Sequence, residues 1–171
     1  MGRFFGRDPL ADPEPLVRRV YAYVAYRIGD GPDAEDVTSE VFERALRYRD
    51  SYDPTKGNAA AWLIGIARRR VDIRGRRWET ASPDTDAAAP GDLEENAVRR
   101  LTLASAMAKL DARERELIAL RYGADLTARQ IGELLGERTN TVEVALHRAL
   151  GRLRSHLEEP SDEVPARAVR I

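Results

Sequence analysis

Apolar residues recur at spacings of three and four along most of this chain, which is the pattern of amphipathic helices. Helices are predicted over about 13–28, 33–48 and from 59 into an arginine-rich segment, then over about 93–110, 112–122, 128–135 and 139–157. Residues 79–92 are mostly Pro, Gly, Ser, Asp and Ala, which is typical of a flexible linker. The sequence therefore predicts an all-α fold of two small helical domains, 13–78 and 93–157, joined by that linker and flanked by disordered tails at 1–12 and 158–171.

Residues 126–154 have the pattern of two helices joined by a tight turn at Gly136. Gly132 stands where the two helices would approach most closely. Thr127 can cap the first helix, and Thr139 or Asn140 the second. The apolar faces are formed by Ile131, Leu134 and Leu135 in the first helix and by Val142, Leu146, Leu150 and Leu153 in the second. A hairpin in an ordinary helical bundle has the same periodicity. The positions of the small residue Gly132 and of the turn at Gly136 favour instead a helix-turn-helix that binds the major groove of DNA.

Charge is segregated along the chain, although the net charge is only −1. Six acidic residues follow one another between 79 and 95 with no Lys or Arg among them. Just before them, six arginines fall within ten residues: Arg68, Arg69, Arg70, Arg74, Arg76 and Arg77. Arginines spaced in this way can follow the phosphates of a nucleic acid and make binding strongly dependent on salt.

Several classes of site are not expected from the composition. The chain has no cysteine, which excludes disulfides, thiol catalysis and cysteine-based zinc sites. His147 and His156, the only histidines, are nine residues apart on one predicted helix, which is not a metal-ligand spacing. No phosphate-binding glycine loop and no nucleophile–base pair is recognisable, so neither a cofactor nor a catalytic residue is expected. Without a signal peptide or an apolar run of roughly 20 residues, the protein is expected to be cytoplasmic and not inserted in a membrane.

Two further segments carry a resemblance to a known family. Residues 33–42, DAEDVTSEVF, resemble the DAEDxxQExF segment that opens a helix of bacterial sigma factors. Residues 62–70, WLIGIARRR, resemble the WLxxIARNR segment that follows it. Together with the helix-turn-helix, they match the two-domain extracytoplasmic-function (ECF) group of the sigma-70 superfamily in order and spacing. The resemblance covers about residues 14–157 and implies a region 2-like helical bundle, a linker and a region 4-like helix-turn-helix.

Asp33, Asp36 and Glu40 stand at positions i, i+3 and i+7 of the second predicted helix and form an acidic stripe. Such a stripe can pair with basic residues of a partner helix, although acids are also common at exposed helix N-termini because they suit the macrodipole. The resemblance implies that the partner is the clamp coiled coil of the β′ subunit of RNA polymerase. Ser39 stands where the family often has Gln. The candidate polymerase-binding residues are Asp33, Glu35, Asp36, Ser39, Glu40 and Phe42.

The resemblance also implies that the loop 53–58 and the helix after it capture the non-template strand of the −10 element, including a flipped base. Asn58 and Lys56 are the polar residues available to bind the edge of that base. Trp62 can stack on melted bases, but its spacing with Ile66 favours packing in the core. Arg69 stands where the family often has Asn. The candidate −10 residues are Asp53, Lys56, Asn58, Trp62, Arg68, Arg69, Arg70, Arg74, Arg76 and Arg77.

The second helix of the helix-turn-helix departs from the family pattern. Relatives often have TVKSRLxRAR, whereas this chain has TVEVALHRAL at 141–150. Glu143 can accept a hydrogen bond from a cytosine amine or can repel phosphate, and Arg148 can bind guanine. The −35 sequence is therefore expected to be unusual or to be bound weakly. The candidate −35 residues are Arg121, Arg129, Arg138, Thr141, Glu143, His147, Arg148 and Arg152.

These features predict a dissociable initiation subunit of RNA polymerase that binds promoter DNA and has no catalytic activity of its own. The resemblance implies contacts with the β′ clamp and the β flap, and a cognate anti-sigma protein is an expectation from the family alone. A regulator of the LuxR type has a similar helix-turn-helix, but it would carry a sensory domain in place of the acidic and arginine-rich helices. An adaptor that kept the fold only to bind proteins is the third alternative, suggested by the unusual recognition helix.

Overall fold

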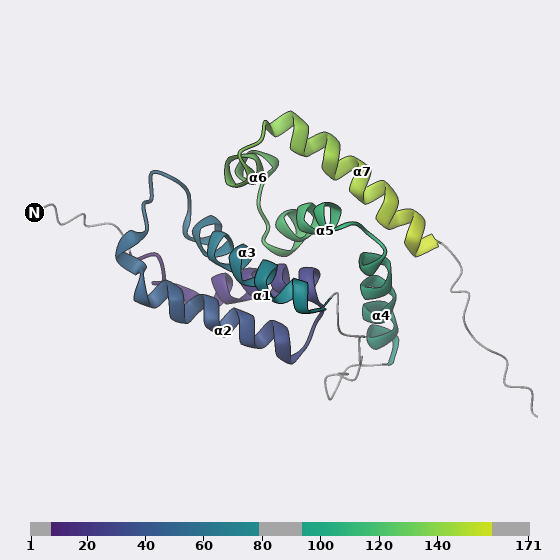
Figure 1. The fold of residues 1–171 in the computed structure, drawn as a ribbon, viewed down its shortest axis with the longest axis horizontal. Coiled ribbons are helices and arrows are strands. Elements are labelled where there is room, and N and C mark those ends of the chain that lie inside the picture. The colour runs from purple at the N-terminus through teal and green to yellow at the C-terminus, as the bar shows by residue number, and fades with distance from the viewer. Residues whose placement is uncertain (1–7, 79–93, 159–171) are drawn as a thin grey trace, which may run out of the picture.

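The computed structural model describes residues 8–78 and 94–158, here called the N-terminal half and the C-terminal half. The N-terminal half contains α1 (Pro13–Ile28), α2 (Pro32–Arg47), the 3-10 turn η1 (Arg49–Ser51) and α3 (Ala59–Trp78). The C-terminal half contains α4 (Glu94–Ala108), α5 (Ala112–Ile118), the π-helical segment η2 (Ala119–Gly123), α6 (Ala128–Leu135) and α7 (Thr139–Glu158). The described ranges hold no strand, so the predicted all-α fold is confirmed (Figure 1).

The predicted linker 79–92 and most of the two predicted tails lie outside the described residues. Residues 8–12 belong to the predicted N-terminal tail, but they form a turn in which the Leu10 N–H donates to Asp8 Oδ1 over 3.0 Å. Leu10 also packs against the main hydrophobic core. The turn leads directly into α1, which begins at Pro13, a residue suited to the first turn of a helix.

Three helices bury their apolar faces in the N-terminal half. In α2, Val37, Val41 and Ala45 are fully buried, as the periodicity predicts. The same period extended by one turn reaches Tyr48, but α2 ends at Arg47 and Tyr48 is 48% exposed. The guanidinium of Arg44 lies 5.4 Å from the centre of the Tyr48 ring. Tyr48 is exposed because the helical period does not continue past the end of α2.

The helix-turn-helix of α6 and α7 is built by local contacts. Thr127 caps α6, since its Oγ1 accepts from the Gln130 N–H and the Gln130 Oε1 accepts from the Thr127 N–H. Gly136 then ends α6 with φ of 71°, a left-handed conformation that favours glycine. A Cβ on Gly132 would lie 2.6 Å from the Glu137 carbonyl oxygen, which confirms a close approach there. Because α7 begins at Thr139, Thr139 and Asn140 stand inside its first turn rather than before it.

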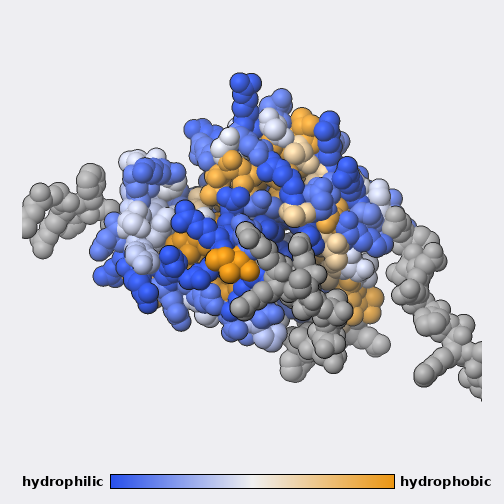
Figure 2. Space-filling view, viewed as in Figure 1, coloured by the Kyte–Doolittle hydropathy of each residue, from blue (hydrophilic) through white to orange (hydrophobic). Residues whose placement is uncertain are grey.

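The two halves pack directly against each other and share one hydrophobic core. Val20, Tyr23 and Val24 of α1 belong to the same buried cluster as Leu117 of α5 and Leu120 of η2. In Figure 1, α1 lies beside α5 while α6 and α7 extend over the other side of α5. Hydrophilic residues cover most of the face seen in Figure 2, and apolar residues form separate patches among them. Within the described ranges, no helix combines the length and apolar character that a membrane span requires.

Candidate nucleic-acid interface

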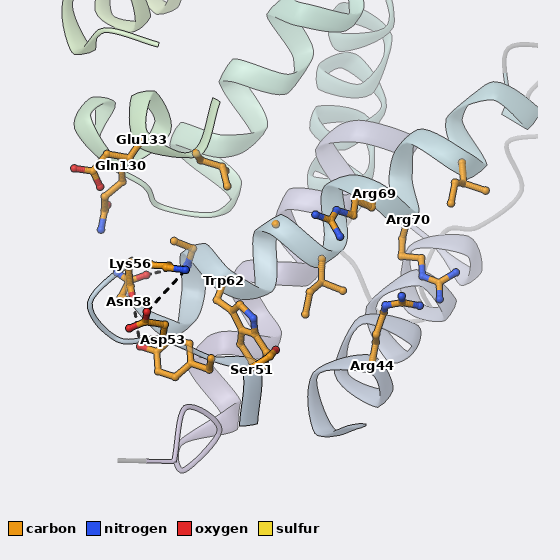
Figure 3. Close-up of a pocket in the computed structure, with 17 residues that line it drawn as sticks. Arg44, Ser51, Asp53, Lys56, Asn58, Trp62, Arg69, Arg70, Gln130 and Glu133 are labelled. Carbon is orange, nitrogen blue, oxygen red and sulfur yellow. Dashed lines mark hydrogen bonds and ion pairs between the residues drawn. The ribbon is translucent and has the colours of Figure 1, made fainter. Parts of the chain in front are cut away.

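A groove of about 590 Å³ lies between the loop after η1, helix α3 and helix α6 (Figure 3). Gln130, Glu133 and Leu134 of α6 line its far side. Its other walls come from the N-terminal half and include six of the residues predicted to bind the −10 element: Asp53, Lys56, Asn58, Trp62, Arg69 and Arg70. The fold therefore gathers most of the predicted −10 residues around one concave surface.

The loop that forms one rim of the groove is held by side-chain hydrogen bonds. The N–H and hydroxyl of Thr55 donate to Asp53 Oδ1 over 2.9 and 2.6 Å, which is an Asx turn. These bonds lower the pKa of Asp53, and the bond from the Thr55 hydroxyl has the largest effect. The Tyr52 hydroxyl donates to the carbonyl of Gly57, whose φ is 154°. Asp53 thus shapes the loop and places a negative charge at the rim, 4.0 Å from the amine of Lys56.

Asn58 caps the first turn of α3. Its Oδ1 accepts from the Ala61 N–H over 2.8 Å, which satisfies one of the free amides at a helix N-terminus. One lone pair of the side-chain oxygen is therefore used within the protein, while its NH₂ group remains available to a ligand. Asn58 can donate two hydrogen bonds to a base through this group, whereas its oxygen retains one lone pair.

Trp62 lies between the core and the groove. Its side chain is half-buried, packs against the main core and also lines the groove. The Tyr52 ring lies 5.4 Å from it, tilted by 54°. The two roles considered for Trp62 are therefore compatible, because one part of the indole packs inward while another part faces the groove. Tyr52 was not among the predicted residues, since only the folded loop brings it to Trp62.

The arginines of α3 differ in their partners. Arg68 is engaged by Glu116 of α5 at 2.6 Å, and Arg70 and Arg74 are engaged by acids of α2. Arg69 is exposed and lines the groove. The side chains of Arg76 and Arg77 lie outside the described part of the structure. Among the α3 arginines with described side chains, Arg69 alone has no carboxylate at ion-pair distance, so it is the cation most available to a phosphate.

The acidic stripe of α2 faces Arg74 of α3. The guanidinium of Arg74 lies 3.4 Å from Asp33, 3.9 Å from Asp36 and 2.8 Å from Glu40. The side chains of Asp33 and Asp36 remain 65% and 69% exposed, so they are still accessible to a partner. The acidic residues predicted to bind polymerase therefore partly neutralise the charge of Arg74, which was predicted to bind DNA. Of the remaining candidates in this group, Glu35 and Ser39 are exposed and Phe42 is half-buried against the core.

The predicted −35 residues fall into two sets. One set is tied to other parts of the C-terminal half: Arg152 lies 2.5 Å from Glu114, Arg121 donates to the Leu126 carbonyl over 3.2 Å, and Arg129 donates to Glu133 over 3.0 Å. The other set is exposed on α7 or just before it and has no ion pair within the described residues: Arg138, Thr141, Glu143, His147 and Arg148. Arg152 anchors α7 to the capping box of α5 through Glu114, and its side chain remains 63% exposed.

Comparisons with known proteins identify the family. Residues 14–79 match the model for sigma-70 region 2, and residues 106–155 match the model for sigma-70 region 4. The chain is similar to the ECF RNA polymerase sigma factor SigL of Mycobacterium tuberculosis, with 31% identity over 147 residues that cover 82% of this chain and 83% of SigL. This chain belongs to the ECF sigma factors. It is therefore a transcription initiation factor that directs RNA polymerase to promoters, and the LuxR-type alternative is not favoured.

Other similar proteins support the assignment of this chain to the ECF sigma factors. BldN of Streptomyces coelicolor, also an ECF RNA polymerase sigma factor, is 29% identical over 77% of this chain, which spans about half (53%) of the length of BldN. Two solved structures share the fold. The sigma factor RpoE of Bartonella quintana, in complex with the anti-sigma factor NepR, has a TM-score of 0.66, 22% identity, and coverage of 88% of this chain and 95% of RpoE. CnrH, in complex with the cytosolic domain of CnrY, has a TM-score of 0.65, 22% identity, and coverage of 89% and 86%.

Proposed function

We propose that the groove beside α3 binds the melted non-template strand of the −10 element. The observation that supports this most strongly is the combination of the Tyr52–Trp62 pair with Arg69 along one concave surface. Aromatic faces and cations arranged in this way suit single-stranded nucleic acid, because bases stack on the rings and phosphates pair with the cations. The amide of Asn58 would donate to the edge of a base turned into the groove. Binding energy to the unpaired strand would drive melting without nucleotide hydrolysis.

We propose that the exposed face of α7 binds the −35 element as duplex DNA. This face presents Thr141, Glu143, His147 and Arg148, with Arg138 just before the helix. The recognition helix of a helix-turn-helix places residues of its N-terminal part against base edges. The C-terminal half would also contact the β flap of the polymerase.

Arg148→Ala should weaken binding to a −35 duplex by about 1–3 kcal/mol and relax its base preference, because a bidentate arginine–guanine contact contributes that much discrimination. The measurement is competition binding of the holoenzyme to duplexes that differ at single −35 positions. Arg154→Ala is the matched control, since Arg154 is also exposed on α7 but lies nearer its C-terminus. Equal losses for the two variants at every position would contradict base reading by Arg148.

We propose that the acidic stripe of α2 docks on the basic surface of a helical partner, the β′ clamp of core RNA polymerase. Asp36 is the best probe of this contact, because it is 69% exposed and lies 3.9 Å from Arg74. An exposed ion pair of this kind adds little to stability. Asp36→Lys can therefore test docking without unfolding the helix.

Asp36→Lys should weaken binding to core polymerase by about 3 kcal/mol, on the order of 100-fold, because it places like charges against each other in the complex. Run-off transcription with purified core polymerase and promoter fragments from the source genome measures the effect. Asp12→Lys is the control, since Asp12 is exposed before α1 and makes no side-chain capping bond. Normal transcription with Asp36→Lys would refute this docking surface. Duplex binding by the wild-type protein with no core-dependent transcript would refute the proposed function as a whole.

The remaining partners follow from the same proposal. A sigma factor that works with RNA polymerase on the chromosome would act in the cytoplasm. Both structural neighbours are complexes with a second protein, RpoE with the anti-sigma factor NepR and CnrH with the cytosolic domain of CnrY. A protein of that class is accordingly a further proposed partner of this chain.

A further inference from the structure

Helix α7 turns an apolar side chain toward solvent at the centre of its exposed face. Val144 is 44% exposed, whereas Val142, two residues earlier in the same helix, is fully buried. With 3.6 residues per turn, Val144 lies about 200° around the helix axis from both Val142 and Leu146, which belong to the main hydrophobic core. Among the described side chains of α7, that of Val144 therefore points most directly away from the protein.

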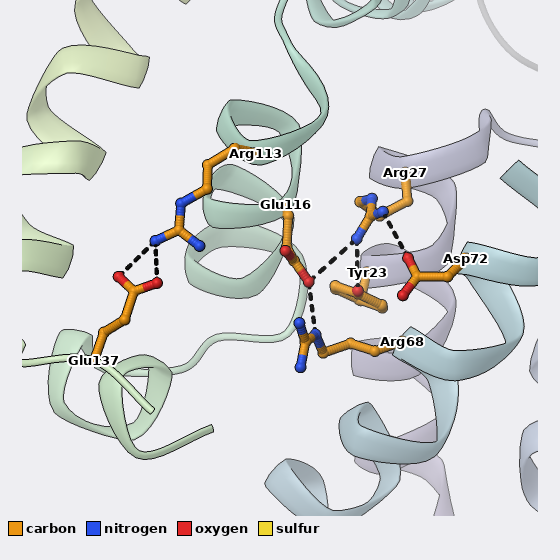
Figure 4. Close-up of polar contacts among 7 residues, drawn as sticks. All are labelled: Tyr23, Arg27, Arg68, Asp72, Arg113, Glu116 and Glu137. Atoms are coloured by element: carbon orange, nitrogen blue, oxygen red, sulfur yellow. Dashed lines mark hydrogen bonds and ion pairs between the residues drawn. The ribbon is translucent and has the colours of Figure 1, made fainter. Parts of the chain in front are cut away.

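The orientation of this face is fixed by contacts near both ends of the helix. Just before α7, the guanidinium of Arg113 on α5 donates to both carboxylate oxygens of Glu137 over 2.5 Å (Figure 4). Further along the helix, Arg152 lies 2.5 Å from Glu114 of α5. Together with the buried apolar face, these contacts oppose rotation of α7 about its axis. Val144 is therefore held in its outward position before any ligand binds.

The residues around Val144 on this face are polar. Asn140 and Thr141 stand one helical turn before it, His147 and Arg148 stand one turn after it, and all four are exposed. A single valine in such surroundings is far smaller than the apolar patches that bind proteins. A β-branched residue exposed in a helix also gains nothing from helix propensity. The ligand that fits this face presents one small apolar group among groups that form hydrogen bonds.

The major groove of DNA offers such a surface. Thymine places its 5-methyl group there, beside the donors and acceptors on the edges of the other bases. We propose that Val144 packs against the 5-methyl group of a pyrimidine in the −35 element and so helps to determine which promoters are bound. This proposal rests on the proposed binding of duplex DNA by the exposed face of α7.

The spacing along α7 limits where this pyrimidine can lie. Val144 and Arg148 are four residues apart, which is about 6 Å along the helix axis and roughly the rise of two base pairs. The methyl group is therefore expected within about two base pairs of the guanine bound by Arg148. The Arg148→Ala competition experiment described above locates that guanine independently.

Replacing thymine with uracil removes the methyl group and leaves every hydrogen-bonding group of the base in place. The duplexes come from a promoter that the holoenzyme transcribes in run-off assays, and each thymine of either strand is replaced in turn. One replacement should weaken competition binding by the wild-type holoenzyme about fourfold, the effect of exposing one buried methyl group. Val144→Ala should bind the thymine and uracil duplexes equally.

Val17→Ala is the matched control, because Val17 of α1 is 40% exposed and loses the same atoms. Val17→Ala should keep the fourfold preference for thymine. Circular dichroism should show unchanged helix content in both variants, since alanine is the better helix former.

A second pair of duplexes identifies the base that carries the methyl group. They hold cytosine or 5-methylcytosine at the sensitive position, paired with guanine. Tighter binding of the methylated duplex by the wild-type protein alone would support recognition of the methyl group on either pyrimidine. A response confined to thymine would support thymine as the only source.

Two results would overturn the proposal. One is a wild-type holoenzyme that binds every uracil duplex as tightly as its thymine parent. The other is an undiminished preference for thymine in Val144→Ala; if this variant also bound core polymerase more weakly, Val144 would instead contact a protein. The proposed function fails separately if the wild-type holoenzyme does not distinguish the −35 duplex from an unrelated duplex of the same length.

Discussion

Gly132→Ala should destabilise the C-terminal half by about 2 kcal/mol, although alanine is the better helix former by about 1 kcal/mol. The new Cβ would lie 2.6 Å from the Glu137 carbonyl oxygen, a separation that real structures avoid. The backbone at this point has little room to move. The Gly132 carbonyl itself accepts from the N–H groups of Gly136 and Glu137, so the turn is tied to the residue that would be enlarged.

The measurement is urea unfolding followed by circular dichroism, together with duplex binding by the holoenzyme. Gly151→Ala is a matched control, since Gly151 lies in α7 and a Cβ added there would meet no neighbouring atom within 4 Å. There the same substitution should stabilise the protein by about 0.5–1 kcal/mol, because only helix propensity changes. Stabilisation by Gly132→Ala would mean that the turn between α6 and α7 is looser than the structure shows.

Trp62→Ala should weaken binding of a melted −10 strand by the holoenzyme about 10- to 100-fold, since stacking on an aromatic ring contributes about 1–3 kcal/mol per base. The ring faces the groove beside Tyr52, and no other described tryptophan side chain is present there. Fluorescence anisotropy with a labelled single-stranded oligonucleotide measures the loss. The holoenzyme is the right species, because the chain is proposed to bind the melted strand together with core polymerase.

Two variants separate stacking from packing. Trp62→Phe keeps an aromatic face and most of the contact with the core, so it should retain most of the binding. Tyr48→Ala removes an exposed aromatic ring outside the groove and should leave binding unchanged. Thermal unfolding of each variant shows how much stability is lost. If Trp62→Ala loses stability but binds the strand normally, Trp62 is only a core residue.

The sequence was most informative where the deciding contacts are local. Thr127 and Gln130 form their capping box across three residues, and Gly132 meets a carbonyl five residues away. Buried positions such as Val37 and Val41 follow from the helical period alone. These features depend on the backbone within one or two turns, so a single sequence is enough to place them.

The sequence could not show which charged side chains face each other. Arg68 and Glu116 are 48 residues apart, and Arg152 and Glu114 are 38 residues apart. Both arginines were expected to bind DNA, whereas the packed helices give each of them a carboxylate partner. A solvent-exposed arginine and one paired between helices look the same in a sequence, because the difference lies in which helix faces meet.

The sequence by itself therefore determined the helical elements, the helix-turn-helix and the acidic and arginine-rich segments that indicate an ECF sigma factor. The tertiary structure decided the direct contact of the two halves, the groove beside Trp62 and the ion pair between Arg68 and Glu116. The physical reason is the range of the interactions. Helix caps and periodicity are set within a few residues, whereas burial and ion pairing between helices depend on the position of the whole chain in space.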